Sequence, residues 1–166
     1  MSSPAITRLV EAVNAALIAR AETIVTAESC TGGLIAAALT DVPGSSAAVF
    51  GGFVIYANEA KSAMIGVDPE LIRRHGAVSA EVARAMADGA LRHSEANVAI
   101  AVTGIAGPGG GSADKPVGLV HFACATAGET VVLERRYGDV GRQRVREETT
   151  AEALRLVLTQ LGAPLP

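Results

Sequence analysis

Apolar residues recur along the chain, in some segments with the spacing of a helix and in others with that of a strand. Apolar positions 6, 9, 10, 13 and 17 lie on one face of a helix that is predicted over 4–19. Residues 23–27 favour a strand, and the apolar, helix-favouring residues 34–39 predict a helix after it. Runs rich in Val, Ile and Phe predict strands at 47–56, 97–102, 117–126 and 130–137, the last two forming an antiparallel hairpin. Two short helices are predicted, one that begins after residue 58 and one that ends near residue 76. Longer helices are predicted over 80–93 and 141–161.

This alternation predicts the fold class. Strands that alternate with helices, together with one hairpin, are typical of a three-layer α/β/α sandwich with a mixed, mostly parallel sheet. The 166 residues contain no repeat and no long linker, so we expect one domain, 1–166, with a single sizeable core. No apolar run approaches the ~20 residues of a membrane span. The first residues lack the pattern of a secretory signal, and Cys30 and Cys124 form no disulfide framework, so we expect a cytoplasmic protein.

Charge and composition exclude two classes of partner. The formal net charge is −3, and the chain has two Tyr, three Phe and no Trp, which argues against a nucleic-acid surface. His75, His93 and His121 show no metal-binding spacing, and there is no Cys-x-x-Cys, so we expect neither a metal nor a cofactor. Each histidine is instead expected at the surface or at the end of a helix.

Candidate chemistry begins at the junction between the first predicted strand and its helix, where residues 27–33 read Ala-Glu-Ser-Cys-Thr-Gly-Gly. Free N–H groups at the start of a helix attract an anion, whether a phosphate or the oxyanion of acyl transfer. Ser29 offers a hydroxyl at that place, and Gly32 and Gly33 let a substrate approach the backbone. The alternative is that Ser29 or Thr31 simply caps the helix.

Two more loops follow predicted strands, one over 56–61 and a glycine-rich one over 103–112. Because ligands collect at the carboxyl ends of strands, all three loops are expected at one edge of the sheet. Asn58 is predicted as the N-cap that places Lys61 in a first helical turn, where burial would make it a neutral base for Ser29. Tyr56 is a candidate to orient the lysine or relay a proton. The alternatives are a solvated lysine and a flexible glycine loop, since that loop matches no nucleotide-binding pattern.

Arg142, Arg144 and Arg146 stand near the start of the last predicted helix, where the helix dipole disfavours cations. An anionic partner would explain this placement, and so would neutralisation by acidic residues of the same segment. The sequence leaves open which of the three arginines meets an anion.

Four segments together resemble the C-terminal domain of the CinA proteins. They are 27–33, the pattern Tyr-x-Asn-x-x-Lys over 56–61, His-Gly-Ala-Val-Ser over 75–79 and Thr-Gly-Ile-Ala-Gly-Pro-Gly-Gly over 103–110. The similarity covers about residues 5–162. Standalone members of that family are nicotinamide-nucleotide amidases. The resemblance therefore implies hydrolysis of the carboxamide of nicotinamide mononucleotide to nicotinic acid mononucleotide and ammonia, in pyridine-nucleotide recycling.

The resemblance also implies roles for individual residues. Ser29 is the expected nucleophile, Lys61 its base and Tyr56 a supporting catalytic residue, while Arg142 pairs with the 5′-phosphate. N–H groups near Thr31 and Gly32 are expected to hold the oxyanion. The full set of expected substrate-binding residues is Cys30, Thr31, Gly32, Gly33, Asn58, Thr103, Gly104 and Arg142. A homo-oligomer, with a dimer favoured, is implied as well; the alternatives in function are a non-catalytic nucleotide-binding module and an amidase for another substrate.

Overall fold

The computed structural model describes residues 2–166, and its helices and strands follow one another in the order that the apolar pattern predicts. In chain order the elements are α1 (Pro4–Ala19), β1 (Ile24–Glu28), α2 (Leu34–Thr40), a 3₁₀ turn (Ser45–Ala47), β2 (Val49–Val54), α3 (Asn58–Ile65), α4 (Pro69–His75), α5 (Ala80–Arg92), β3 (Val98–Gly104), β4 (Leu119–Ala125), β5 (Thr130–Arg136) and α6 (Arg142–Gln160).

The five strands form one mixed sheet in the order β2-β1-β3-β4-β5. β1 runs parallel to both β2 and β3, whereas β4 is antiparallel to both β3 and β5. The predicted hairpin of β4 and β5 is therefore confirmed, but the expectation of a mostly parallel sheet is wrong, since two of the four strand pairings are antiparallel. The physical reason is the connection from β3 to β4, which is the glycine-rich loop and carries no crossover helix, so the chain returns antiparallel.

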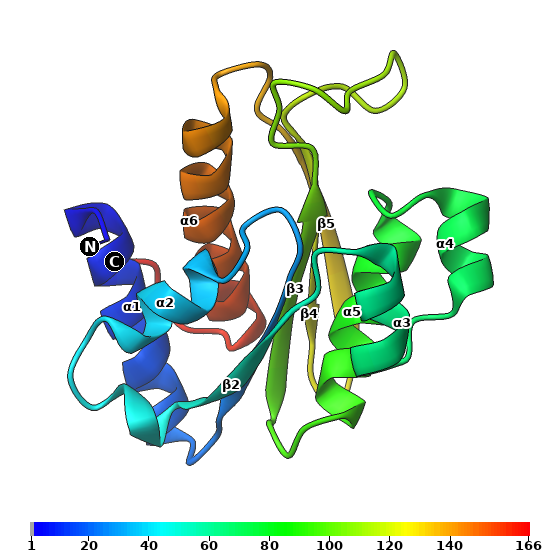
Figure 1. Ribbon diagram of the computed structural model, residues 1–166. Helices are drawn as coiled ribbons and strands as arrows, with labels where there is room; N and C mark the ends of the chain where they lie inside the picture. Colours follow the sequence, from blue (N-terminus) through cyan, green and yellow to red (C-terminus); the bar gives the residue numbers. More distant parts are fainter. Residues whose placement is uncertain (1) are drawn as a thin grey trace.

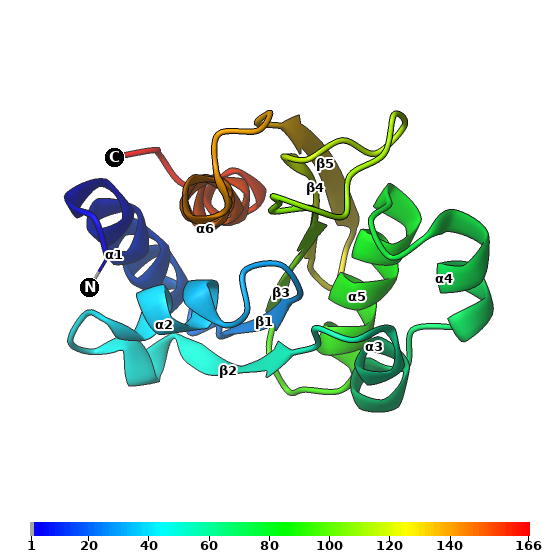
Figure 2. The ribbon, with the colours of Figure 1, turned by 45° about the horizontal axis from the view of Figure 1, so that its top comes forward.

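Helices pack on both faces of the sheet: α1, α2 and α6 on one side, and α3, α4 and α5 on the other (Figures 1 and 2). The period of two along β3 divides its side chains between two apolar clusters. Val98, Ile100 and Val102 lie in the cluster with α1 and α6, and Ala99 and Ala101 lie in the cluster with α5. Successive residues along a strand therefore face opposite helical layers, and this alternation decides which layer the residue at the end of a strand faces.

β2, at the edge of the sheet, is shorter than predicted. It spans Val49–Val54 rather than 47–56, because residues 45–47 form the 3₁₀ turn, and its register against β1 is irregular near Phe50. A Cβ atom at Gly52 would lie 2.4 Å from Oγ1 of Thr26, so β1 and β2 approach each other closely at this glycine. The prediction that Asn58 is the N-cap of α3 is wrong. Ala57 takes that position, and its carbonyl accepts the N–H of Lys61.

Along residues 2–166, no helix combines the length and the apolar character that crossing a bilayer requires.

Candidate active site

Ser29 follows the carboxyl end of β1 and faces the helical layer that contains α3 and α5. Val25 and Ala27 belong to the cluster on that side, so two residues further on Ser29 faces the same way, while Glu28 faces α2. The Ser29 N–H donates to the carbonyl of Val102 at 3.1 Å, which keeps the residue in line with the end of β3. Ser29 is thus a buried hydroxyl at a carboxyl edge of the sheet.

Lys61 reaches this hydroxyl from the first turn of α3. Its side chain is 1% exposed, and its Nζ lies 3.2 Å from Oγ of Ser29, 3.1 Å from the carbonyl oxygen of Ile55 and 3.2 Å from that of Tyr56. Burial lowers the pKa of Lys61, and the nearby Cys30 and Glu59 oppose that shift only in part.

The three oxygens around Nζ can accept the three N–H groups of the charged amine, and the same arrangement serves the neutral amine. A neutral amino group has two N–H donors and one lone pair, and two carbonyls and one hydroxyl surround this one. The carbonyls of Ile55 and Tyr56 can accept the two N–H groups, which leaves the lone pair for the proton of Ser29. The geometry therefore provides what a general base for a serine nucleophile needs.

Cys30, the neighbour of Ser29, does not compete as a nucleophile. Its side chain is 5% exposed, and burial raises the pKa of its thiol to about 12. A thiol with that pKa holds almost no thiolate at neutral pH, and the thiolate is the reactive form.

The start of α2 is capped by a residue that the sequence reasoning missed. Neither Ser29 nor Thr31 caps the helix, whose N-cap is Gly33 with φ of 102° and no side-chain bond. Instead the fully buried carboxylate of Glu28 accepts the N–H groups of Gly33 at 3.0 Å, Ile35 at 3.0 Å and Ala36 at 2.8 Å. The N–H groups of this helix start are thus used by the chain's own carboxylate. The only local signal was an acidic residue shortly before a helix.

The turn between β1 and α2 keeps two N–H groups free. Within residues 2–166, the N–H groups of Cys30 and Thr31 donate to no protein acceptor, whereas that of Gly32 donates to the carbonyl of Ser29 at 3.1 Å. The prediction named N–H groups near Thr31 and Gly32 for the oxyanion. The geometry offers the pair at Cys30 and Thr31 instead.

Arg142, the first residue of α6, joins two of the other loops. Its guanidinium donates to the carbonyl of Gly107 at 3.0 Å and to the hydroxyl of Tyr56 at 3.1 Å. Tyr56 is 60% exposed, and its contact with Lys61 is made by its backbone carbonyl, not by its hydroxyl. The loops at 29–33, 56–61 and 103–112 therefore meet at one edge of the sheet, as expected from the order of strands and loops.

Three other residues expected in the substrate site, Thr103, Gly104 and Asn58, lie in different surroundings. Thr103 is 1% exposed and donates its hydroxyl to the carbonyl of Ala77 at 2.8 Å, beside Ser29 at the end of the neighbouring strand. A Cβ atom at Gly104 would lie 2.7 Å from the Val120 side chain, so strand packing requires this glycine. Asn58 is exposed and lines a groove between α3 and α4.

The structure also places the three histidines. His75 ends α4 and His93 caps α5, as predicted, but His121 is buried in β4 opposite Thr103, and that burial lowers its pKa. Among residues 2–166, no three His, Cys, Asp or Glu side chains gather in a way that could hold a metal ion.

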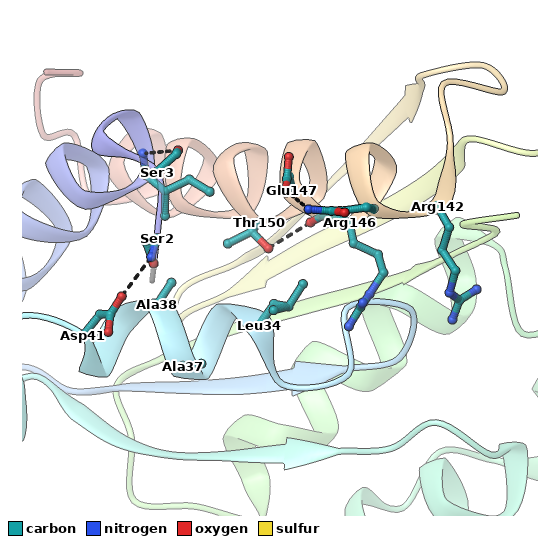
Figure 3. A pocket seen from close by; sticks show the side chains of 12 residues that line it. Ser2, Ser3, Leu34, Ala37, Ala38, Asp41, Arg142, Arg146, Glu147 and Thr150 are labelled. Carbon is teal, nitrogen blue, oxygen red and sulfur yellow. Dashed lines mark hydrogen bonds between the residues drawn. The ribbon is translucent and has the colours of Figure 1, made fainter.

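A groove of about 700 Å³ lies between α2 and α6 on the other side of the turn. Leu34 and Ala37 line it from α2, and Arg142 and Arg146 line it from α6 (Figure 3). Ser29 and Lys61 do not line this groove. No residue of 29–33 lines the groove, and Ser29 faces the opposite helical layer.

Comparison with known proteins agrees with the motifs. The family model of the CinA C-terminal domain matches residues 6–161. The nicotinamide-nucleotide amidohydrolase PncC of Escherichia coli K12 is 48% identical over 160 residues, which cover 96% of this chain and 97% of that protein. A CinA-like protein of Acidobacterium capsulatum is 53% identical over 143 residues, which cover 86% of this chain. The chain spans about a third of the length of that relative, since the matched part covers 34% of it.

Solved structures share the whole fold. The crystal structure of the competence/damage inducible protein CihA from Agrobacterium tumefaciens matches with a TM-score of 0.95 and 49% identity, covering 98% of both chains. A CinA superfamily protein from Klebsiella pneumoniae matches with a TM-score of 0.90 and 34% identity, covering 95% of this chain and 98% of the other. The resemblance carried by the four sequence segments is thereby confirmed, and the chain belongs to the CinA C-terminal domain family.

Proposed function

We propose that this protein hydrolyses the carboxamide of nicotinamide mononucleotide to nicotinic acid mononucleotide and ammonia. Two findings support the proposal: the 48% identity to a nicotinamide-nucleotide amidohydrolase over nearly all of both chains, and the buried contact of 3.2 Å between Nζ of Lys61 and Oγ of Ser29. The second finding carries the proposal, because a buried lysine whose pKa is lowered by burial, in contact with a buried serine hydroxyl, forms the base–nucleophile pair that amide hydrolysis needs.

The mechanism follows from these contacts. Lys61 removes the proton of Ser29 as Oγ attacks the amide carbon, and the N–H groups of Cys30 and Thr31 stabilise the oxyanion. Lys61 then gives its proton to the departing ammonia as the C–N bond breaks and an ester to Ser29 remains. A water molecule, deprotonated by Lys61, hydrolyses that ester and regenerates the serine. Arg142, at the outer end of the site, pairs with the substrate's 5′-phosphate.

The assay that tests this function measures both products. Purified protein is incubated with nicotinamide mononucleotide, ammonia is measured with a coupled dehydrogenase, and nicotinic acid mononucleotide by chromatography. We expect the two products in equal amounts, and only a small residual rate from a Lys61→Met preparation purified in parallel, which controls for contaminating amidases. Nucleotide binding without ammonia release would indicate the non-catalytic binding module. The dimeric state and the cytoplasmic location stay predictions.

A further inference from the structure

Arg146 contacts the serine turn from the side opposite to Lys61. It lies on α6, one residue after the buried Val145, and its side chain points toward the start of α2 (Figure 3). Its Nε donates to the carbonyl of Cys30 at 3.2 Å, and its Nη2 donates to the carbonyl of Thr31 at 2.8 Å. One guanidinium group therefore holds two consecutive carbonyls of the turn.

These two bonds determine where the N–H groups of the turn point. In a trans peptide unit the C=O and N–H bonds point in opposite directions. Because the carbonyl of Cys30 points to Arg146, the N–H of Thr31 points away from Arg146. The carbonyl of Thr31 likewise points to Arg146, and the N–H of Gly32 points away and reaches the carbonyl of Ser29.

The N–H of Thr31 is left with its donor capacity unused. Thr31 has no exposed surface, and in residues 2–166 neither its N–H nor its Oγ1 has a hydrogen-bond partner. Buried polar groups without a partner are uncommon in folded proteins and call for an explanation. A donor that is buried, directed and unpaired two residues after Ser29 suits an oxygen atom that is present only during the reaction.

We propose that Arg146 is a positioning residue for amide hydrolysis, which acts by holding the peptide unit between Cys30 and Thr31 so that the Thr31 N–H meets the oxyanion. The inference rests on the proposed function, because an oxyanion forms only if Ser29 attacks an amide. Arg146 itself contacts no substrate; it acts through the backbone.

The other two arginines of the segment differ in their contacts. Arg142 reaches the outer end of the site, where it contacts Gly107 and Tyr56. Arg144 is exposed and forms an ion pair with Glu148 one helical turn later. Arg144 is therefore the matched control: the same residue type on the same helix, two positions away, with no contact to the turn.

The kinetic test compares Arg146→Ala and Arg146→Lys with Arg144→Ala in the ammonia assay. Loss of one oxyanion donor typically lowers kcat by about 10²–10³, so we expect a fall of that scale in Arg146→Ala with KM within about threefold of the wild type. Lysine cannot donate to both carbonyls in the planar manner of a guanidinium, so Arg146→Lys is expected to fall in between. Arg144→Ala is expected to keep the wild-type kcat and KM.

A second readout separates this inference from the proposed function. Amide hydrogen exchange of the peptide that contains residues 29–33 should be faster in Arg146→Ala and Arg146→Lys than in the wild type, and unchanged in Arg144→Ala. An inactive wild type would refute the proposed function, while exchange would still report on the positioning. Unchanged exchange, an unchanged kcat, or a rise in KM alone would each overturn the role of Arg146. If Arg146→Ala does not fold, Arg146→Lys supplies both measurements.

Discussion

Glu28 offers a sharp test of how the serine turn is held, through the change Glu28→Gln. The carboxylate accepts three N–H groups at 2.8–3.0 Å and has no exposed surface. Glutamine keeps the size of the side chain but replaces one oxygen with an NH₂ group. That NH₂ group must face at least one of the three N–H donors, because all three partners of Glu28 are donors.

The magnitude follows from these contacts. Hydrogen bonds to charged groups contribute about 1.5–3 kcal/mol each, and a buried donor left unpaired costs about 1–3 kcal/mol. Glu28→Gln loses at least one such bond and weakens the others, because the charge is removed. We therefore expect the free energy of unfolding to fall by roughly 2–4 kcal/mol. For a chain of this size, that corresponds to a fall in Tm of roughly 4–16 °C.

The assay is urea and thermal unfolding at pH 7, followed by circular dichroism. Glu11→Gln is the matched control, since Glu11 is exposed on α1 and its substitution should change the free energy of unfolding by less than about 0.5 kcal/mol. If Glu28→Gln unfolds within about 0.5 kcal/mol of the wild type, the carboxylate does not cap α2 in the way described, and the turn must be held by other contacts.

Four further predictions concern the chemistry of the site. Burial lowers the pKa of Lys61, so kcat/KM should rise with pH along an acid limb that is absent from the residual activity of Lys61→Ala. For the same reason unfolding takes up a proton between the folded-state pKa and the ordinary 10.5, so urea titrations should show wild-type stability rising with pH relative to Lys61→Met. Arg142→Ala should raise KM for nicotinamide mononucleotide far more than it lowers kcat, a loss of about 1.5–3 kcal/mol in kcat/KM, and should hardly change turnover of nicotinamide riboside; an equal loss on both substrates would remove the phosphate role. Full activity should persist in EDTA, and a loss that zinc restores would reveal a metal site.

Local pattern was enough to predict most elements. The apolar period marks α1, α5 and α6 within a few residues, and the turn signal at 127–129 marks the hairpin. The errors lie where local choices compete. Asn58 has the side chain of an N-cap, but the chain leaves β2 early and Ala57 takes the position. A loop rich in glycine gave no sign that β4 would return antiparallel.

In the site, too, local patterns identify some residues, whereas the contacts between distant residues depend on the fold. Ser29 and Lys61 could be named because each lies in a short recognisable segment, but their contact joins residues 32 positions apart. Glu28 reaches five to eight residues ahead, outside the usual spacing of a helix cap, so no local rule identifies it. Arg146 meets the serine turn from more than 110 residues away, and only the packing of α6 against α2 brings them together.

The turnover of Ser29→Ala tests whether Ser29 is the nucleophile of an amidase. Ammonia release from nicotinamide mononucleotide is followed for the wild type and the variant, with circular dichroism to show that both are folded. Removing a catalytic nucleophile should lower kcat by at least about 10³ with the fold retained. A folded Ser29→Ala variant that turns over within tenfold of the wild type would show that Ser29 is not the nucleophile.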